Sequence, residues 1–227
     1  MSIFAIGDLH LSLSVDKPMD IFGGWENYTE RLKSNWEKIV TPNDTVVIPG
    51  DISWAMKLED AEEDFKFLDS LPGTKIILKG NHDLWWDTVN KLNIFFQKNK
   101  INSIKIVFNS AIEVEDYAIC GSRGWFSDSG EQNSKVMLRE CQRLATSIEK
   151  AIATGKEPLV FLHYPPIYTD FYCDKIFEVL KEYGITKVYY GHLHGNSIKG
   201  AISEYDGIKL KLVSADALHF TPFLVSK

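Results

Sequence analysis

The feature of this sequence that most constrains its fold is a junction in which a short apolar segment is followed at once by glycine, histidine, carboxylate or amide residues. The junction occurs five times in 227 residues. It is found at residues 7–10 (GDLH), 50–51 (GD), 80–83 (GNHD), 163–166 (HYPP) and 191–195 (GHLHG). The preceding segments are too short for helices and too apolar for half-exposed strands, so we expect buried strands. Ligands of open α/β sheets bind beyond the carboxyl ends of strands, and the junctions should therefore face one crevice.

The rest of the chain alternates strand candidates with amphipathic helices. Apolar runs predict strands at residues 3–6, 45–48, 75–78, 104–108, 117–120, 159–162 and 187–190. Apolar residues at helical spacing predict helices over 28–39, 58–68 and 137–152. This alternation indicates a layered α/β architecture, and Asp206-Gly207 between two strand-like runs predicts a hairpin and therefore a mixed sheet. Because no repeat or long linker is present, we expect a single domain over residues 1–227.

Charge and cysteine content narrow the functional class. Lys and Arg number 25 against 31 Asp and Glu, a formal net charge of -6 that does not support a broad basic footprint for duplex nucleic acid. The three cysteines form no CxxC pair and are expected to be reduced, buried thiols. The first residues lack the pattern of a secretory signal, and no apolar run reaches the roughly 18 residues that span a bilayer. We expect a cytoplasmic protein with no membrane partner.

The residue types at the junctions are those that bind divalent metal ions. Carboxylate, amide and imidazole donors without thiolate suit manganese, iron or zinc. The seven candidates are Asp8, His10, Asp51, Asn81, His163, His192 and His194. A catalytic ion typically takes about three protein ligands, so seven indicate two ions that share a carboxylate. Five of the six histidines lie at the junctions, which disfavours a purely structural explanation, and we interpret the sixth, His219, as structural.

The order of these motifs, Asp-x-His, Gly-Asp, Gly-Asn-His-Asp, a lone His after a strand and Gly-His-x-His, resembles the signature of the calcineurin-like metallophosphoesterase superfamily. The resemblance extends from Asp8 to His194 and implies two mixed β-sheets packed as a sandwich and flanked by helices. It also implies ligand roles. One metal would be held by Asp8, His10 and His194, the other by Asn81, His163 and His192, with Asp51 bridging the two.

The resemblance further implies a binuclear phosphoesterase acting on a small phosphomonoester or phosphodiester. A hydroxide held between the metals would attack phosphorus in line, and His82 would protonate the departing alkoxide. In the protein-phosphatase branch the Gly-Asp motif continues with Asp and Arg, whereas residues 52–55 here read ISWA, which disfavours that branch. The group that supports His82 is therefore open. Arg123 is our candidate for binding the substrate phosphate, with a solvated surface arginine as the alternative.

Other classes of function remain to be weighed. A metal-dependent amidohydrolase barrel would need a longer chain and would begin with His-x-His. A nuclease would add a DNA-engaging region, which the negative charge disfavours, and an inactive scaffold should have lost ligands or the acid, whereas all eight positions are present. We therefore expect an enzyme, with specificity set by loops at residues 16–25, 85–87, 124–133 and 165–171. The aromatic residues near the junctions either stack on a flat leaving group or, as we prefer, pack locally.

Overall fold

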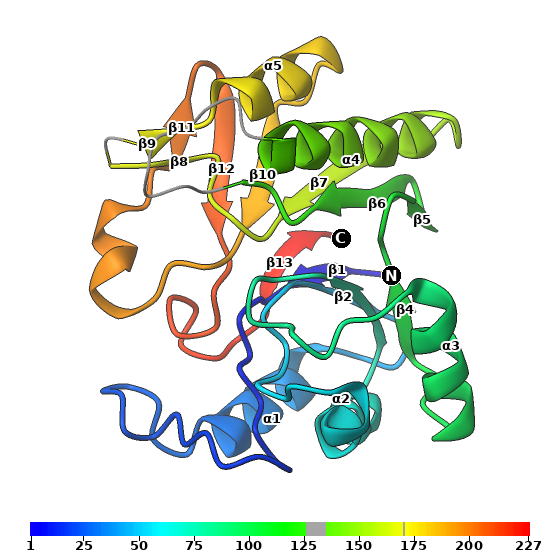
Figure 1. Cartoon of the computed structure of the whole chain (residues 1–227), viewed down its shortest axis with the longest axis vertical. Coiled ribbons are helices and arrows are strands. Elements are labelled where there is room, and N and C mark those ends of the chain that lie inside the picture. The colour runs from blue at the N-terminus through cyan, green and yellow to red at the C-terminus, as the bar shows by residue number, and fades with distance from the viewer. Residues whose placement is uncertain (126–134, 170) are drawn as a thin grey trace.

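Two β-sheets pack against each other between two layers of helices in the computed structural model, which describes residues 1–125, 135–169 and 171–227 (Figure 1). The first sheet has the order β13 (Phe223–Ser226), β1 (Ile3–Ala5), β2 (Thr45–Pro49), β3 (Thr74–Leu78), β4 (Ile104–Ile106). The second has the order β11 (Glu204–Tyr205), β12 (Ile208–Leu212), β10 (Lys187–Tyr190), β7 (Glu157–Leu162), β6 (Tyr117–Ser122), β5 (Ile112–Val114). In both, the central strands are parallel and the edge strands β13, β11 and β5 are antiparallel. The predicted pair of mixed sheets is confirmed.

Helices cover the outer face of each sheet (Figure 1). The first sheet is covered by α1 (Tyr28–Ile39), the 3₁₀ turn η1 (Leu58–Ala61), α2 (Glu62–Ser70) and α3 (Val89–Lys98), and the second by α4 (Lys135–Ile152) and α5 (Asp174–Glu182). The predicted helices at 28–39 and 137–152 are confirmed, whereas the one at 58–68 is divided into η1 and α2. The sequence analysis missed α3 and α5, because helices of 10 and 9 residues contain too few turns for a clear period.

Shorter elements also escaped prediction. They are η2 (Gly195–Gly200) and the two-residue strands β8 (Ile167–Tyr168) and β9 (Phe171–Tyr172), which form a small sheet of their own, together with β5 and β13. The hairpin at Asp206-Gly207 is present between β11 and β12, with both turn residues at positive φ. Strands of two to four residues are specified by their neighbours in the sheet more than by their own pattern, which explains why they were missed.

The buried side chains alternate between two faces of each sheet. On β2, Val46 and Ile48 pack toward the helices, whereas Val47 packs between the two sheets. On β7, Val160 and Leu162 pack toward α4 and α5, whereas Phe161 faces the first sheet. Strands buried on both faces explain the continuous apolar runs in the sequence. The three apolar layers fix the relative position of the two sheets and of the loops that leave them.

Two other features of the described residues bear on the sequence analysis. The three cysteines, Cys120, Cys141 and Cys173, are buried and unpaired, as predicted. Within residues 1–125, 135–169 and 171–227, no helix combines the length and the apolar character needed to cross a bilayer.

Candidate metal centre

The five junctions leave β1, β2, β3, β7 and β10 at their carboxyl ends and continue the strand pairing into the loops. The Asp8 N–H donates to the Gly50 carbonyl at 2.9 Å, and the His10 N–H donates to the Asp51 carbonyl at 3.0 Å. In the second sheet, the Gly191 N–H donates to the His163 carbonyl at 3.1 Å. These backbone bonds keep neighbouring loops in register. The polar side chains that follow the strands therefore meet at one end of the sandwich, as predicted.

Six of the seven predicted ligands lie in two groups, and within each group the candidate ligand atoms all lie within 4.8 Å of one another. The groups are Asp8, His10, His194 and Asp51, His163, His192. In the first, His10 Nε2 lies 3.2 Å from His194 Nε2, which lies 3.4 Å from Asp8 Oδ1. In the second, His163 Nε2 lies 3.4 Å from Asp51 Oδ2. The seventh, Asn81, adjoins the second group, with its Oδ1 2.7 Å from His163 Nε2.

Asp51 lies between the two groups. Its Oδ2 is 3.8 Å from His10 Nε2 and 3.4 Å from His163 Nε2, so one carboxylate oxygen faces an imidazole of each group. Its Oδ1 accepts the His82 backbone N–H at 2.8 Å, which holds the carboxylate in this orientation. This is the geometry expected of a carboxylate that bridges two ions.

The electrostatics of the site fit divalent cations. Asp8 and Asp51 are buried, and among the described residues neither pairs with a lysine or arginine. Burial and the Asp8 charge raise the pKa of Asp51 to about 8, whereas contact with His194 overcomes burial and lowers the pKa of Asp8. Burial lowers the pKa of His10 to about 3. Two crowded carboxylates, together with the imidazoles of His10 and His192, which favour their neutral form, are a donor set that cations stabilise.

Four candidate ligands have a strained backbone. The φ angles of Asp8, His10, Asp51 and His192 are 57°, 47°, 51° and 72°, which lie in the left-handed region that residues with a Cβ rarely adopt. Such conformations cost on the order of 1–3 kcal/mol each and persist where the surroundings over-determine them, most often at functional sites. The strained φ angles therefore indicate that the surrounding structure fixes the positions of these side chains at a cost in backbone conformational energy.

Glycines next to the ligands allow close approach of the loops. A Cβ at Gly80 would lie 2.1 Å from Asp51 Oδ1, and one at Gly191 would lie 2.2 Å from Asp8 Oδ2. Real Cβ contacts are never this short, so any other residue would displace a carboxylate. The two carboxylates can converge only because both positions are glycine.

Two histidines are oriented by groups behind them. The His194 imidazole donates from Nδ1 to Asp216 Oδ1 at 3.0 Å, which overcomes burial and raises the pKa of His194 to about 10. The His163 imidazole donates from Nδ1 to the Pro49 carbonyl at 3.1 Å. In both cases Nε2 faces the site, and a metal ion bound there would displace the proton from His194 Nε2. The sequence analysis missed Asp216, although it follows the strand-like run ending at Val213 and is thus another carboxylate beyond a strand end.

His82 lies beside the two groups without joining either. Its ring is 4.5 Å from the ring of Trp54 and 5.7 Å from that of His10, and burial lowers its pKa. Within the described part of the chain, its imidazole makes no hydrogen bond. The neighbouring Asp83 is buried and points elsewhere, accepting the backbone N–H groups of Asp51 and Gly80 at 2.9 and 2.7 Å. Asp83 therefore braces two ligand loops and is not the group that supports His82.

Arg123 lies on the His163–His192 side of the site. Its carbonyl accepts the Tyr164 N–H at 2.8 Å, and its guanidinium lies 5.9 Å from the centre of the Tyr164 ring. That ring in turn lies 4.6 Å from the ring of His192. The Arg123 side chain is 27% exposed, which is less than a solvated surface arginine would be. The structure thus brings Arg123 near the candidate ligands without placing it among them.

The aromatic residues near the junctions divide into two sets. Trp85 is 2% exposed and packs in the core, whereas Trp54 stacks on the His10 ring at 4.7 Å and Trp25 meets the same ring edge-on at 5.9 Å. Trp25 is the last residue of the 16–25 loop that was predicted to set specificity, although its ring had not been singled out. Of the loops predicted to set specificity, residues 126–133 and 170 lie outside the described residues.

Comparisons with known proteins identify the family and agree with the fold. The family model of the calcineurin-like phosphoesterases matches residues 1–196. A protein of unknown function, AQ665 from Aquifex aeolicus, is 19% identical with a TM-score of 0.56, covering 98% of this chain and 95% of its own. TT1561 of Thermus thermophilus is 11% identical with a TM-score of 0.56, covering 99% and 97%. At these identities the two structures support the fold alone. Among curated proteins, the comparison finds no match.

Proposed function

This chain belongs to the calcineurin-like phosphoesterase family, and we propose that it hydrolyses small phosphate esters with the help of two divalent metal ions. The observation that carries the proposal is the position of Asp51 Oδ2 between His10 and His163, one imidazole from each ligand group. A single ion would need neither this shared carboxylate nor seven donors. Manganese, iron and zinc all suit oxygen and imidazole donors, and we propose one or two of these as the native ions.

We propose different catalytic roles for the residues on the two sides of the site. When bound, the two ions would activate a water molecule and offset negative charge on the phosphoryl oxygens. His82, outside both ligand groups, would donate a proton to the leaving oxygen. A dianionic phosphate beside His82 would favour the imidazolium and so counteract the effect of burial on its pKa. Arg123 would contribute positive charge toward the substrate on the opposite side, next to His192.

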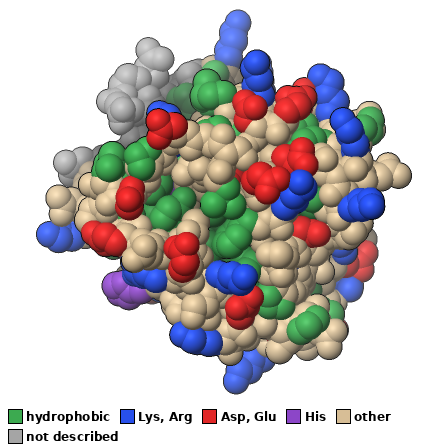
Figure 2. All heavy atoms as spheres, turned by 90° about the horizontal axis from the view of Figure 1, so that it is seen from below, with side chains coloured by type: hydrophobic (Ala, Val, Ile, Leu, Met, Phe, Trp, Pro, Cys, Tyr) green, Lys and Arg blue, Asp and Glu red, His purple; other side chains and the backbone are tan. Residues whose placement is uncertain are grey.

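The surface agrees with a small substrate. In Figure 2, basic and acidic side chains alternate with exposed apolar ones on the face seen from below, and they form no continuous basic surface there. That face therefore offers no basic footprint for duplex nucleic acid, in line with the formal net charge of -6. The free, buried cysteines are typical of a reducing compartment, and we propose the cytoplasm.

A hydrolysis panel tests this function. The full chain is stripped with a chelator, reloaded with manganese, iron or zinc, and assayed on p-nitrophenyl phosphate, bis(p-nitrophenyl) phosphate and cyclic nucleotides. We expect hydrolysis that depends on added metal, and the relative rates on monoester and diester decide between those two substrate classes. If the reloaded protein binds metal and hydrolyses none of these esters, the inactive scaffold becomes the better explanation.

A further inference from the structure

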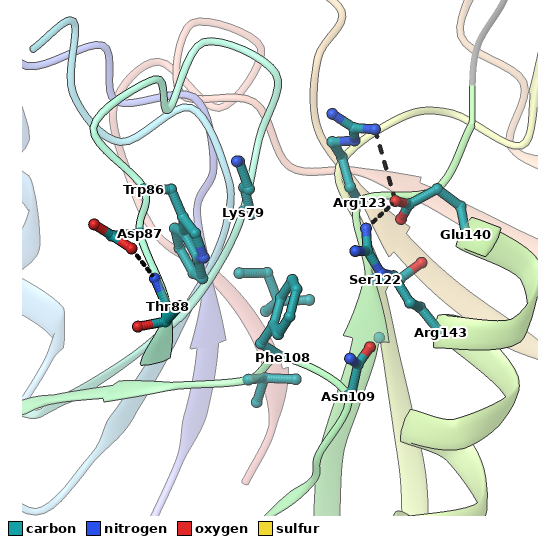
Figure 3. Close-up of a pocket in the computed structure, with 13 residues that line it drawn as sticks. Lys79, Trp86, Asp87, Thr88, Phe108, Asn109, Ser122, Arg123, Glu140 and Arg143 are labelled. Atoms are coloured by element: carbon teal, nitrogen blue, oxygen red, sulfur yellow. Dashed lines mark hydrogen bonds and ion pairs between the residues drawn. The ribbon is translucent and has the colours of Figure 1, made fainter. Parts of the chain in front are cut away.

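A cavity of about 340 Å³ lies between the carboxyl ends of β3 and β6, beside the candidate metal centre (Figure 3). Lys79 and Trp86, which follow β3, form one wall, and Arg123 and Arg143 form the other. Figure 3 shows these side chains facing each other across the space, with Phe108 between them. None of the described residues that line it is a candidate ligand. We refer to the space enclosed by these five residues as the basic cavity.

Among the described residues, the positive charge in the basic cavity exceeds the negative charge that lies against it. Glu140 is 1% exposed, and its Oε1 lies 2.5 Å from Arg143 Nη1 and 3.6 Å from Arg123 Nη2, so one carboxylate serves two guanidinium groups. The other acid, Asp87, pairs with Lys91, whose Nζ lies 2.7 Å away. Within the described part of the chain, the Lys79 ammonium has no ion-pair partner. An anion in the cavity would meet cations that the described residues do not fully neutralise.

The Arg123 side chain also has an unmet hydrogen-bond donor. Its Nε is buried and, among the described residues, has no partner. A buried donor without a partner costs about 1–3 kcal/mol, so its presence in a native structure points to an acceptor that the described residues do not provide. The guanidinium is nevertheless positioned, because Glu140 and the Tyr164 ring contact it. Arg123 is therefore held ready for an acceptor.

Two aromatic rings add a flat, apolar surface to the cavity. The rings of Trp86 and Phe108 lie 6.2 Å apart between centroids at an angle of 43°, and the Arg143 guanidinium lies 5.1 Å from the Phe108 ring centre. Aromatic faces bordered by guanidinium groups suit a planar ring that carries an anionic substituent. The combination of aromatic faces and guanidinium groups therefore favours an organic anion over water as the occupant of the cavity.

Both walls of the basic cavity are formed by residues close to the candidate metal centre. Lys79 is two residues before Asn81, and Arg123 contacts Tyr164, whose ring packs on His192. We propose that the cavity binds the part of the substrate that lies beyond the reacting phosphoryl group, and that this part is a flat ring bearing a second anion, a phosphate or a carboxylate. The inference rests on the proposed function and narrows its substrate class.

Matched aryl phosphates test the inference on the metal-reloaded full chain. The set is phenyl phosphate, 4-carboxyphenyl phosphate, benzene-1,4-diyl bisphosphate and, as an uncharged control, 4-carbamoylphenyl phosphate. We expect kcat/KM at least about tenfold higher than for phenyl phosphate with one or both anionic esters, the difference that a charge-assisted hydrogen bond confers, and less than threefold with the amide. The carboxylate and bisphosphate esters distinguish the two kinds of anion.

Variants locate the effect in the cavity. Arg143→Ala should reduce the preference for the anionic ester at least about tenfold, as measured by the ratio of kcat/KM values, because it removes one cation from the wall. Arg139→Ala is the matched control, since Arg139 lies on the same helix, is exposed and does not line the cavity. Lys79→Met serves as a second variant in case Arg143→Ala fails to fold, and circular dichroism checks both.

Binding of phosphonates separates failure of the inference from failure of the proposed function. Phenylphosphonate and 4-phosphonobenzoate contain a P–C bond that is not hydrolysed, and calorimetry gives their Kd values directly. Hydrolysis of phenyl phosphate with no preference for the anionic esters and equal Kd values would overturn the inference alone. Failure to hydrolyse any ester would overturn the proposed function. The inference that the cavity binds an anionic ring would then stand only if 4-phosphonobenzoate bound at least about tenfold more tightly than phenylphosphonate and if Arg143→Ala abolished this difference.

Discussion

The buried charged side chains at the two ends of the parallel strands have different kinds of partner. At the amino ends, the Asp44 carboxylate accepts the Ser2 N–H at 2.6 Å and both the N–H and hydroxyl of Thr41, at 2.8 and 2.7 Å. At the same end, the Lys75 ammonium donates to the carbonyls of Leu71 and Gly73, at 2.6 and 2.8 Å. Each buried charge at this end has partners within the chain, as native proteins generally require.

At the carboxyl ends, the buried charges face one another. Asp8 and Asp51 share a site with His10 and His192, whose imidazoles burial keeps from ionising, and four of the residues that form the site have φ angles between 47° and 72°. The same fold therefore satisfies each buried charge separately at one end. At the other end Asp8 and Asp51 also accept backbone N–H groups, but they lie so close together that the Asp8 charge raises the pKa of Asp51, a repulsion that a bound cation would relieve. Buried charges occur at both ends of the strands. The functional end is distinguished by two like charges that lie close together and perturb each other's ionisation.

Replacing one buried aspartate at each end should produce the largest contrast. Asp51→Asn removes charge from the carboxylate between the two groups, so we expect both ions to be lost or weakened and kcat to fall by at least about 10³, equivalent to several kcal/mol of charge stabilisation. Metal analysis after reloading and assay on the best ester measure this. Asp44→Asn, the same change at the other end, should lower the free energy of unfolding by about 1–3 kcal/mol and leave two ions bound. Retention of both ions by Asp51→Asn would contradict the bridging role.

The second largest effect is expected at His82, and it depends on the leaving group. His82→Ala should keep both ions, because its ring belongs to neither ligand group. On an alkyl ester the rate should fall by about 10²–10⁴, the usual contribution of general acid catalysis, whereas on p-nitrophenyl phosphate the loss should shrink because that group leaves without a proton. Steady-state rates on both esters and metal analysis test this. Equal losses on both esters would mean that His82 acts through coordination or loop structure.

A smaller effect is expected behind the site. Asp216→Asn keeps the shape of the side chain that receives the His194 N–H but removes its charge, so we expect metal affinity or activity to fall by about 10–100-fold. Competition with a chelator indicator measures the affinity. Asp206→Asn is a suitable control, because Asp206 is an exposed partner of Lys181 far from the ligand groups in the fold. A change below twofold in Asp216→Asn would mean that the hydrogen bond does not tune the site.

The sequence predicted the strands and ligands at the carboxyl ends better than the groups that hold them. Asp8, Asp51 and His192 follow short, continuous apolar runs, so pattern and residue type identify both the strand and the chemistry. The roles of Asp83 and Asp216 depend on contacts between residues 22 to 32 positions apart, and no local pattern encodes such contacts. Lys75 is a still clearer case, since a lysine inside a strand gives no sign in the sequence that its ammonium will be buried.

The smallest effect on activity is expected at Lys75. A substitution there tests whether the amino ends of the strands contribute to stability independently of the metal site at the carboxyl ends. Burial lowers the pKa of Lys75 to about 8 from 10.5, so between these values the unfolded chain binds more protons than the folded one and stability rises with pH. The rise is at most about 3 kcal/mol. Lys75→Met should remove it and leave metal content and kcat unchanged. The measurement is the difference in free energy of unfolding between the two proteins from pH 7 to 11, which cancels the other titrating groups. Lys105→Met on β4, an exposed lysine, is the control. A difference independent of pH, or loss of metal from Lys75→Met, would show that the two ends of the strands are not energetically separate.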